Sequence, residues 1–468
     1  MKGWLSAFFL LAACVHFPAY RPLAAPGQQQ GFVIRDVRVF AATGPEALEH
    51  QDVLVERGVI VAVRPTDAQD APGQVIDGRG LTVLPGLIDL HAHLTLTAAP
   101  PWYLTTPKPE HNAQAHVYAG VTTVLDAGGN PDEILGLKKQ IAEGKLAGPR
   151  IYFAGQHLTV PGGYPLSMIH DVYGRMATWS LEGSHVRGVR SEEELLGEVD
   201  RLHGLGASFI KLMVATIPPP DAPRLPEPWV RAAVKRAHEH GMKVAAHIDT
   251  AEDALQCARD GVDLLAHGIE APAVTEEEAR TIAASGISME PTLVNYERFD
   301  ELEALHFQSS AIERESEPKE LMDAFSDERL HQQRERFIGS SFQPWGDELL
   351  KYSAERPRNL YKLYKAGVPV LAGSDAMGSI GVFAGAIHDE LKLQVEAGLP
   401  AAEVLLGATS RAARFLDPKA RFGTVEPGKA ADLLLVRGDP LQDIRATRDI
   451  VQVFIAGAPV QRNQPSRR

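Results

Sequence analysis

The sequence predicts an α/β protein: a closed barrel of eight parallel strands and helices, a (β/α)8 or TIM barrel, joined to a small β-sandwich. Three observations support this fold. Short apolar runs alternate with helix-like stretches through the middle of the chain, as in a parallel sheet covered on both faces. Several runs end in a histidine or an aspartate, where such barrels place active-site residues. Short strand-like segments with turn signals flank this central part on both sides.

The first residues have the features of an export signal. Lys2 precedes an apolar stretch, residues 3–13, that is too short to span a bilayer. This stretch runs into the sequence LAAC, which resembles a bacterial lipobox with Cys14 as the lipidated residue. Cleavage near Ala24 and an ordinary cytoplasmic N-terminus are the alternatives. We therefore predict that residues 1–30 are a signal and tether, and that the protein is periplasmic and lipid-anchored through Cys14.

Composition and charge narrow the classes of partner. The chain has two cysteines, so lipidation of Cys14 would leave Cys257, in a helical pattern, as a buried and inert thiol. The formal charge of −13 and the pI near 5.7 argue against nucleic acid, because no basic stripe is present to neutralise phosphates. We expect a small-molecule substrate and contact with a membrane only through the N-terminal segment. The sequence does not decide whether the protein forms a homo-oligomer.

The two ends of the chain predict one small β domain. Strand-like segments with turn signals occur in both flanks, and each flank is too short to form a core of its own. We expect residues 31–85 and 421–462 to pair into a single β-sandwich. The predicted strands are 32–40, 53–56, 59–63, 75–76, 431–436 and 451–455.

Residues 86–420 predict the barrel. The first strand ends at His91, and helical stretches such as 228–240 and 276–284 fill the gaps between strands. The seven further strands are expected at 121–125, 150–153, 209–214, 244–247, 264–267, 287–292 and 369–372. The connection from Leu293 to Lys365 is unusually long and rich in charged residues. It is interpreted as solvated helices on the barrel rim, with a lid over the strand ends as the alternative.

Two histidines stand at the end of the first barrel strand. In LPGLIDLHAHL, residues 84–94, His91 and His93 share a face because side chains alternate along a strand. Neutral imidazole is the commonest metal ligand. Alone, the pair fits ordinary hydrogen-bonded histidines equally well. The later strand ends, which carry His247, His267 and Asp375, favour a metal site.

Lys211 lies within an otherwise apolar strand, Phe209 to Val214. A buried ammonium is costly, so this lysine must be paired or neutral. A neutral amine can take up carbon dioxide and become a carbamate, an anionic ligand able to bridge two metal ions. Pairing with a carboxylate on the barrel floor is the alternative.

The candidate ligands are more numerous than one metal needs. A single tetrahedral ion with an open position needs three protein ligands, and this set has six: His91, His93, Lys211, His247, His267 and Asp375. We therefore predict two divalent ions, with zinc favoured by ligands that are nitrogen and oxygen without thiolate. Two metals would activate a bridging hydroxide, and Asp375 would transfer its proton to the leaving group.

These motifs together resemble the amidohydrolase superfamily, in the imidazolonepropionase-like and prolidase-like branch that has two metals and a carboxylated lysine. The resemblance extends from Gly31 to Val460. It implies that His91, His93 and Asp375 hold one metal, that His247 and His267 hold the other, and that Lys211 bridges them. The motifs are LPGLIDLHAHL, GVTTVLDAGG (120–129), FIKLM (209–213), AAHI (245–248), LLAHG (264–268), GSDA (373–376) and GTVEPGKAADLLLV (423–436).

One departure from the family concerns the substrate. Dipeptidase-like relatives often carry a glycine pair followed by histidine after the third strand, and here Tyr164 takes the place of that histidine. A tyrosine hydroxyl can donate a hydrogen bond, and His157 is close enough in sequence to substitute. Tyr296, after the seventh strand, is a third candidate for contact with substrate.

The predicted function is hydrolysis of an amide-type C–N bond in a dipeptide or an N-acyl amino acid. The same two-metal centre would also attack esters, so a lactonase or phosphotriesterase is an alternative. A lipid-anchored binding protein that has lost catalysis is another, and that class predicts missing ligands. None of the expected ligands is missing from this sequence.

Overall fold

The computed structural model describes residues 15–16, 31–67, 73–215, 223–270, 272–304, 306–327, 332, 335 and 354–462. The predicted signal and Cys14 lie outside the described residues, so lipidation and export stay predictions. From the expected tether, β1 (Val15–His16) is described and pairs in parallel with β8 (Leu104–Thr105). Among the described helices, none has the length and apolar character that a membrane span requires.

A ring of parallel strands forms the centre of the molecule. Two ladders join β7 to β9 and β9 to β10, and further ladders join β13, β14, β15 and β16 in order. These strands are buried along nearly their whole length, as the apolar runs predicted, except for β10, in which buried and half-buried residues alternate. The strands are β7 (Leu87–Ala92), β9 (Val121–Asp126), β10 (Arg150–Phe153), β13 (Phe209–Met213), β14 (Lys243–His247), β15 (Leu264–Ala266) and β16 (Ser288–Glu290).

The third barrel strand is broken in two. β10 pairs with β9, and after a break at Gly155, which has a φ of 75°, the chain continues as β11 (His157–Thr159) and pairs with β13. Glycine tolerates this left-handed conformation at no steric cost. An insertion follows, with α3 (Leu166–Tyr173), α4 (Arg175–Leu181) and β12 (Val186–Gly188), the last of which pairs with β11.

The predicted eighth strand, 369–372, closes the ring but is not a regular strand. Met289 and Val370 form an isolated parallel bridge, and the N–H of Leu90 donates to the carbonyl of Ala372 at 2.9 Å. The end of a neighbouring helix competes for the same backbone groups, because Ala372 donates to Gly407 at 3.4 Å. A regular ladder to β7 therefore cannot form over the whole segment.

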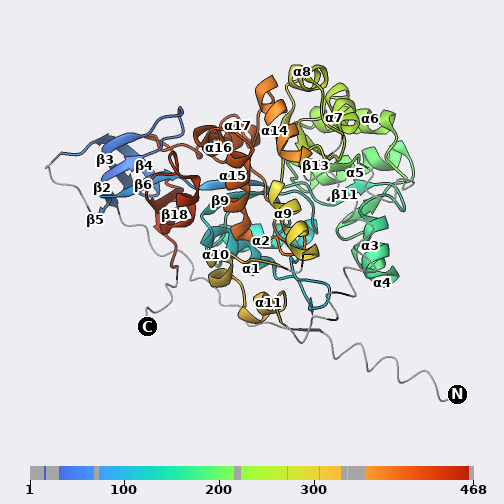
Figure 1. Cartoon of the computed structure of the whole chain (residues 1–468), viewed down its shortest axis with the longest axis horizontal. Helices are drawn as coiled ribbons and strands as arrows, with labels where there is room; N and C mark the ends of the chain where they lie inside the picture. Colours follow the sequence, from blue (N-terminus) through green and yellow to red (C-terminus); the bar gives the residue numbers. More distant parts are fainter. Residues whose placement is uncertain are drawn as a thin grey trace, which may run out of the picture.

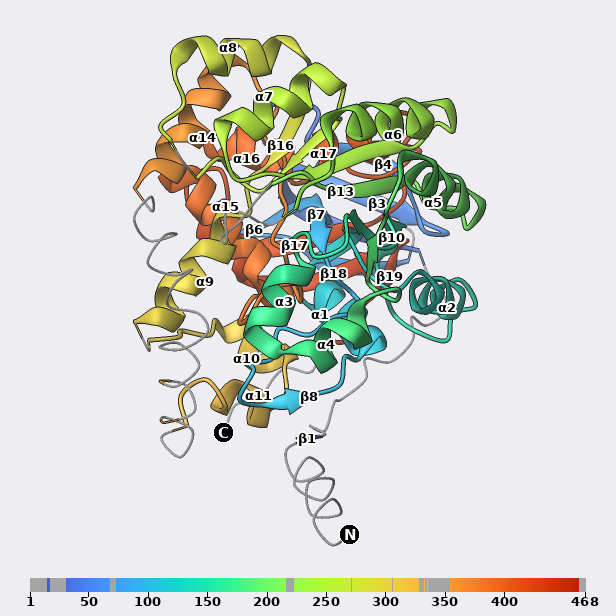
Figure 2. The same cartoon turned by 90° about the vertical axis from the view of Figure 1, so that its right-hand side faces the viewer.

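Helices cover the outside of the ring, and α5 to α8 follow one another around it (Figure 2). Reciprocal side-chain caps begin α7 at Thr250 and α8 at Thr275, three residues after His247 and eight residues after His267. The helices are α1 (Pro109–Tyr118), α2 (Pro131–Ala142), α5 (Glu192–Gly204), α6 (Glu227–Glu239), α7 (Ala251–Asp260), α8 (Glu276–Ala284), α14 (Glu355–Ala366), α15 (Ile387–Glu396), α16 (Ala401–Gly407) and α17 (Ser410–Leu416).

Strands from both ends of the chain lie together at one end of the molecule (Figure 1). They form one sheet in the order β19-β18-β17-β6-β2-β3-β4, which forks where β5 also pairs with β2. The sheet encloses its own core, in which Phe32 stacks on Phe454 at 4.7 Å. The strands are β2 (Phe32–Val39), β3 (Leu48–Glu56), β4 (Val59–Pro65), β5 (Gln74–Asp77), β6 (Leu81–Pro85), β17 (Leu433–Arg437), β18 (Ile450–Ile455) and β19 (Ala458–Pro459).

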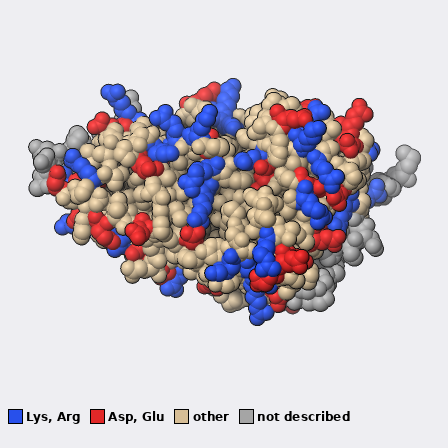
Figure 3. Space-filling model, turned by 90° about the horizontal axis from the view of Figure 1, so that it is seen from above, with Lys and Arg blue, Asp and Glu red and all other residues tan. Residues whose placement is uncertain are grey.

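The long connection after β16 contributes α9 (Leu293–Glu303), α10 (Ala311–Ser316) and α11 (Lys319–Asp323). Its described part is tied to the barrel by buried charges, because Arg298 contacts both Glu313 and Asp389. These helices are therefore packed on the barrel, and are more than solvated decoration. Cys257 is buried and free, as the sequence predicted. Acidic and basic side chains are interspersed over the face in Figure 3.

Candidate active site at the strand ends

Four imidazole rings form a continuous cluster at the C-terminal ends of three barrel strands. Neighbouring ring centroids are 5.2 Å apart for His93 and His91, 4.7 Å for His91 and His267, and 4.2 Å for His267 and His247. All four residues are at most 5% exposed. Burial lowers the pKa of His247 to about 3, and it lowers those of His91 and His267 well below the usual range. At His93 burial also lowers the pKa, but the hydrogen bond to Asp375 and its charge outweigh burial, so the net shift is upward. His91, His247 and His267 are therefore neutral nitrogen donors, and His93 is paired with the carboxylate of Asp375.

Three of these rings are held by a partner on Nδ1. His91 contacts Glu290 at 2.7 Å, His93 contacts the carbonyl oxygen of Gly128 at 2.6 Å, and His267 contacts the hydroxyl of Thr292 at 2.7 Å. A partner on one ring nitrogen fixes the orientation of the ring and leaves the other nitrogen for a metal.

Asp375 completes this cluster and lies just after residues 369–372, the eighth segment of the barrel. Its Oδ1 lies 3.0 Å from His93 Nε2 and 3.6 Å from His91 Nε2. Its Oδ2 accepts hydrogen bonds from the amide of Asn295 at 3.0 Å and from the hydroxyl of Ser379 at 2.8 Å. One carboxylate oxygen therefore faces the imidazoles, while the other is held by two donors.

The backbone at these positions is strained. Three non-glycine site residues have positive φ angles: 76° at His267, 44° at Thr292 and 62° at Asp375. Such conformations are uncommon for residues with a Cβ, and most of all for a β-branched residue such as threonine. Strain of this kind concentrates at functional sites, where the surrounding structure holds it in place.

Lys211 reaches the same cluster from β13. Its side chain is 1% exposed, and Nζ lies 3.4 Å from His91 Nε2. Burial lowers the pKa of Lys211 to about 8. Among the described residues, no ion pair within 4.0 Å involves this amine. The structure thus brings together all six predicted ligand residues, and it does not support the alternative of a lysine paired on the barrel floor.

The site's own donors fit divalent metal ions. His91 Nε2, His93 Nε2 and a carboxylate oxygen of Asp375 lie within 4.8 Å of one another. His247 Nε2 is buried without a hydrogen-bond partner. Buried polar atoms are nearly always paired, so an orphaned imidazole nitrogen in such a cluster marks a place for a ligand. A second ion would use donors from His247, His267 and Lys211.

Comparison with known proteins decides the family. The model of the amidohydrolase family matches residues 82–460. The chain belongs to the amidohydrolase family. This amidohydrolase is 27% identical to an uncharacterized protein of Mycobacterium tuberculosis over 77% of its own length and 80% of that protein. It is 24% identical to the imidazolonepropionase of Geobacillus kaustophilus over 83% and 84% of the two chains.

Solved structures show the same architecture. A Xaa-Pro dipeptidase with bound methionine matches with a TM-score of 0.72 and 22% identity, over 92% of this amidohydrolase and 99% of the dipeptidase. A putative prolidase from Bifidobacterium longum matches with a TM-score of 0.71 and 25% identity, over 96% and 97% of the two chains. The predicted family and fold class are confirmed, and the amidohydrolase is a hydrolase acting on carbon–nitrogen bonds.

Two of the three predicted substrate residues lie beside the imidazole cluster, and the third contacts Glu270, which follows His267 along the chain. His157 lies beside His93, with ring centroids 5.3 Å apart, and Tyr164 lies 4.7 Å from His247. Tyr296 is buried beneath the guanidinium of Arg356, which lies 4.1 Å from the ring centroid, and its hydroxyl forms a hydrogen bond with Glu270. All three are within the site region of the amidohydrolase, and whether they touch substrate stays a prediction.

Sequence reasoning missed several residues of this site. Glu290, Thr292 and Asn295 position candidate ligands, and Asp249 and Glu270 are buried carboxyl groups next to His247 and His267 along the chain. Glu290 ends β16, so the strand-end rule applied to the seventh strand would have found it. Asn295 had no such signal, because it lies in the first turn of α9.

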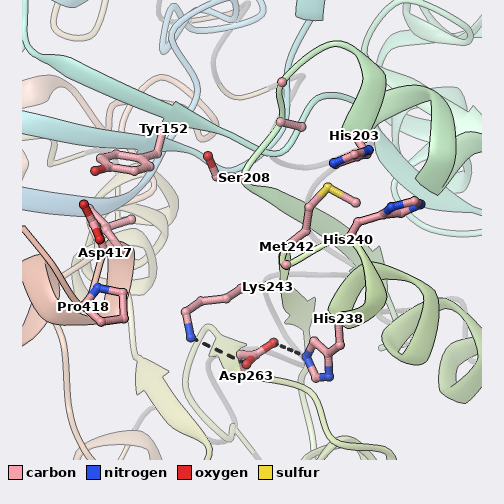
Figure 4. Close-up of a pocket in the computed structure, with 14 residues that line it drawn as sticks. Tyr152, His203, Ser208, His238, His240, Met242, Lys243, Asp263, Asp417 and Pro418 are labelled. Atoms are coloured by element: carbon pink, nitrogen blue, oxygen red, sulfur yellow. Dashed lines mark hydrogen bonds and ion pairs between the residues drawn. The ribbon is translucent and has the colours of Figure 1, made fainter.

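An open pocket of about 780 Å³ lies at the opposite, N-terminal ends of the strands (Figure 4). Ser208 directly precedes β13 and Lys243 begins β14, and both line it. Its charged groups are paired: His238 and Lys243 approach Asp263 at 2.9 and 3.8 Å. Because active sites of such barrels lie at the C-terminal face, we assign no catalytic role to this pocket.

Replacing Glu290 is expected to loosen metal binding by the amidohydrolase. Glu290→Ala removes the partner of His91 Nδ1 and should weaken metal affinity by about 10- to 100-fold, as loss of such outer partners typically does. Glu290→Gln keeps an acceptor for His91 and should retain most of the affinity. Competition with a chromophoric chelator measures both, and equal affinity in wild type and Glu290→Ala would contradict this role.

Proposed function

We propose that this amidohydrolase is a metal-dependent enzyme that cleaves the amide-type C–N bond of a dipeptide or an N-acyl amino acid. One observation carries the proposal. Four buried imidazoles, a buried lysine and a carboxylate from separate segments converge at the C-terminal ends of the barrel strands. No structural need explains six such groups in one place, since burying polar groups without partners is costly.

The proposed cofactors are two divalent ions, with zinc favoured by the nitrogen and oxygen donors. His91, His93 and Asp375 would hold one ion. His247 and His267 would hold the other, with a carboxylated Lys211 between them. When bound, such ions activate water and polarise a carbonyl oxygen.

Asp375 is the proposed proton-transfer group. Its Oδ2 is occupied by Asn295 and Ser379, so Oδ1 is the oxygen open to the site. At that oxygen it would accept the proton of the attacking water and return it to the leaving nitrogen. The two donors keep the carboxylate from rotating away. A fixed base loses little freedom at the moment of reaction.

The proposed substrate contacts are the hydroxyl groups of Tyr164 and Tyr296 and the imidazole of His157. Tyr164 and His157 stand on either side of the cluster and can donate hydrogen bonds to a substrate oxygen. Gly128 permits the approach of His157, because a Cβ there would lie 2.1 Å from the imidazole Nε2. Tyr296, which contacts Glu270 beyond the end of β15, would provide a further hydroxyl group to the substrate.

A substrate panel tests the proposal. Metal-replete protein is expected to hydrolyse members of a set of dipeptides or N-acyl amino acids, and to lose the activity on treatment with a chelator. A lactone and a phosphotriester series serves as the comparison. Turnover confined to those esters would contradict amide hydrolysis and favour the alternative reaction on the same centre. No turnover in any series would contradict catalysis of these classes altogether.

A further inference from the structure

A second group of ionisable side chains adjoins the histidine cluster at the ends of β14 and β15. Asp249 is two residues beyond His247, and Glu270 is three residues beyond His267. The N–H of Glu270 donates to the carbonyl of Asp249 at 2.8 Å, which fixes the two loops side by side. Asp249 is 8% exposed and Glu270 is 6% exposed.

The position of Asp249 is rigid. Its N–H donates to the carboxylate of Asp253 at 3.2 Å, and Asp253 is also the residue that caps α7 reciprocally with Thr250. These contacts fix the backbone of Asp249 relative to the start of α7. Its Oδ1 lies 3.5 Å from Nε2 of His247, so the carboxyl group faces the proposed active site.

Among the described residues, Glu270 and Asp253 each have an arginine within ion-pair distance, and Asp249 does not. Glu270 forms an ion pair with Arg356 at 4.0 Å, and Arg224 is engaged by Asp253 at 3.2 Å. Both oxygens of Asp249 are buried without a hydrogen-bond partner among the described residues. A buried carboxyl group whose oxygens lack a hydrogen-bond donor is costly, and such an arrangement persists where a ligand supplies the missing partner.

We infer that Asp249, with Glu270 beside it, binds a positively charged nitrogen of the substrate, an ammonium group next to the scissile amide. This inference rests on the proposed function and narrows it, because a dipeptide carries such a group and an N-acyl amino acid does not. The rings of Tyr164 and His247 are tilted against each other with centroids 4.7 Å apart, and His247 Nε2 lies 3.5 Å from Asp249 Oδ1. The carboxyl group therefore adjoins the place where a substrate would meet the metal ligands.

Two matched pairs of compounds test it. L-alanyl-L-phenylalanine and N-propionyl-L-phenylalanine differ only in the ammonium group, and so do (1-aminoethyl)phosphonate and ethylphosphonate. Hydrolysis reports on the first pair and calorimetric binding to metal-replete protein reports on the second. We expect the wild type to favour the ammonium member by about 10- to 100-fold in both, the range of one charged hydrogen bond.

The variants are Asp249→Asn and Glu270→Gln, with Glu277→Gln as a control because it removes the same charge from an exposed position on α8. Asp249→Asn should reduce the preference to within about threefold while metal content stays at the wild-type value. Glu270→Gln should reduce it less, and Glu277→Gln should leave it unchanged.

Equal hydrolysis or binding of both members by the wild type would overturn the inference and leave amide hydrolysis intact. So would an Asp249→Asn protein that loses metal and keeps the preference, because Asp249 would then serve His247 alone. Preference for the aminophosphonate without hydrolysis of either amide would support the inference and count against the proposed function.

Discussion

Asp375→Asn is expected to reduce kcat by about 10³-fold while leaving the fold intact. The amide keeps the size of the carboxylate and has one oxygen in place of two. It is a far weaker base than a carboxylate, so transfer of the proton from water to the leaving nitrogen would fail. Because the loss concerns the chemical step, substrate binding should change much less than kcat.

Steady-state kinetics with metal analysis and circular dichroism check this result. Ser379→Ala is the matched control, since it removes one of the two donors to Oδ2 and leaves the carboxylate in place. We expect that variant to lose far less activity than Asp375→Asn. A rate close to wild type in Asp375→Asn would show that another group moves the proton.

The ligand set was predictable because each member follows a local rule. His247 and Asp375 stand at or just beyond the ends of short apolar runs, and Lys211 interrupts one, so each is visible within a window of a few residues. Parallel strands in a barrel bring such ends to one face, which converts six local signals into one site. No knowledge of distances between strands was needed.

The residues that orient these ligands were not predictable in the same way. Glu290 and His91 are 199 positions apart in sequence, and their 2.7 Å contact depends on how β16 and β7 are arranged around the ring. Asn295 reaches Asp375 only because α9 begins directly at the strand end, after the strained Thr292. Such contacts follow from tertiary packing, which a pattern of apolar residues does not encode.

The break in the third strand and the irregular eighth segment show a related limit. Gly155 gave no sequence signal that distinguishes a break within one strand from a turn between two. The eighth segment was located correctly as an apolar run, yet the backbone of Gly407 takes one of its hydrogen bonds. The run of apolar residues locates the segment in the sequence. Competition for its backbone hydrogen bonds decides whether it forms a regular strand.

Lys211→Ala is expected to bind about half the metal of the wild type and to lose activity by about 10³-fold. The amine lies 3.4 Å from His91 Nε2 within the cluster of imidazole rings, and burial already lowers its pKa to about 8, which favours the neutral form that reacts with carbon dioxide. Without a bridging anion, His247 and His267 alone offer too few donors for a stable site.

Metal analysis of dialysed protein and activity with added short-chain acids measure the effect of this substitution. Acetate or propionate is small enough to enter the space of the missing side chain, and either should restore part of the activity and of the second metal. Lys235→Ala, at an exposed position on α6, controls for loss of a lysine and should behave as wild type. Unchanged metal content in Lys211→Ala would exclude the bridge, and the two ions would then have to be held by the histidines and Asp375 alone.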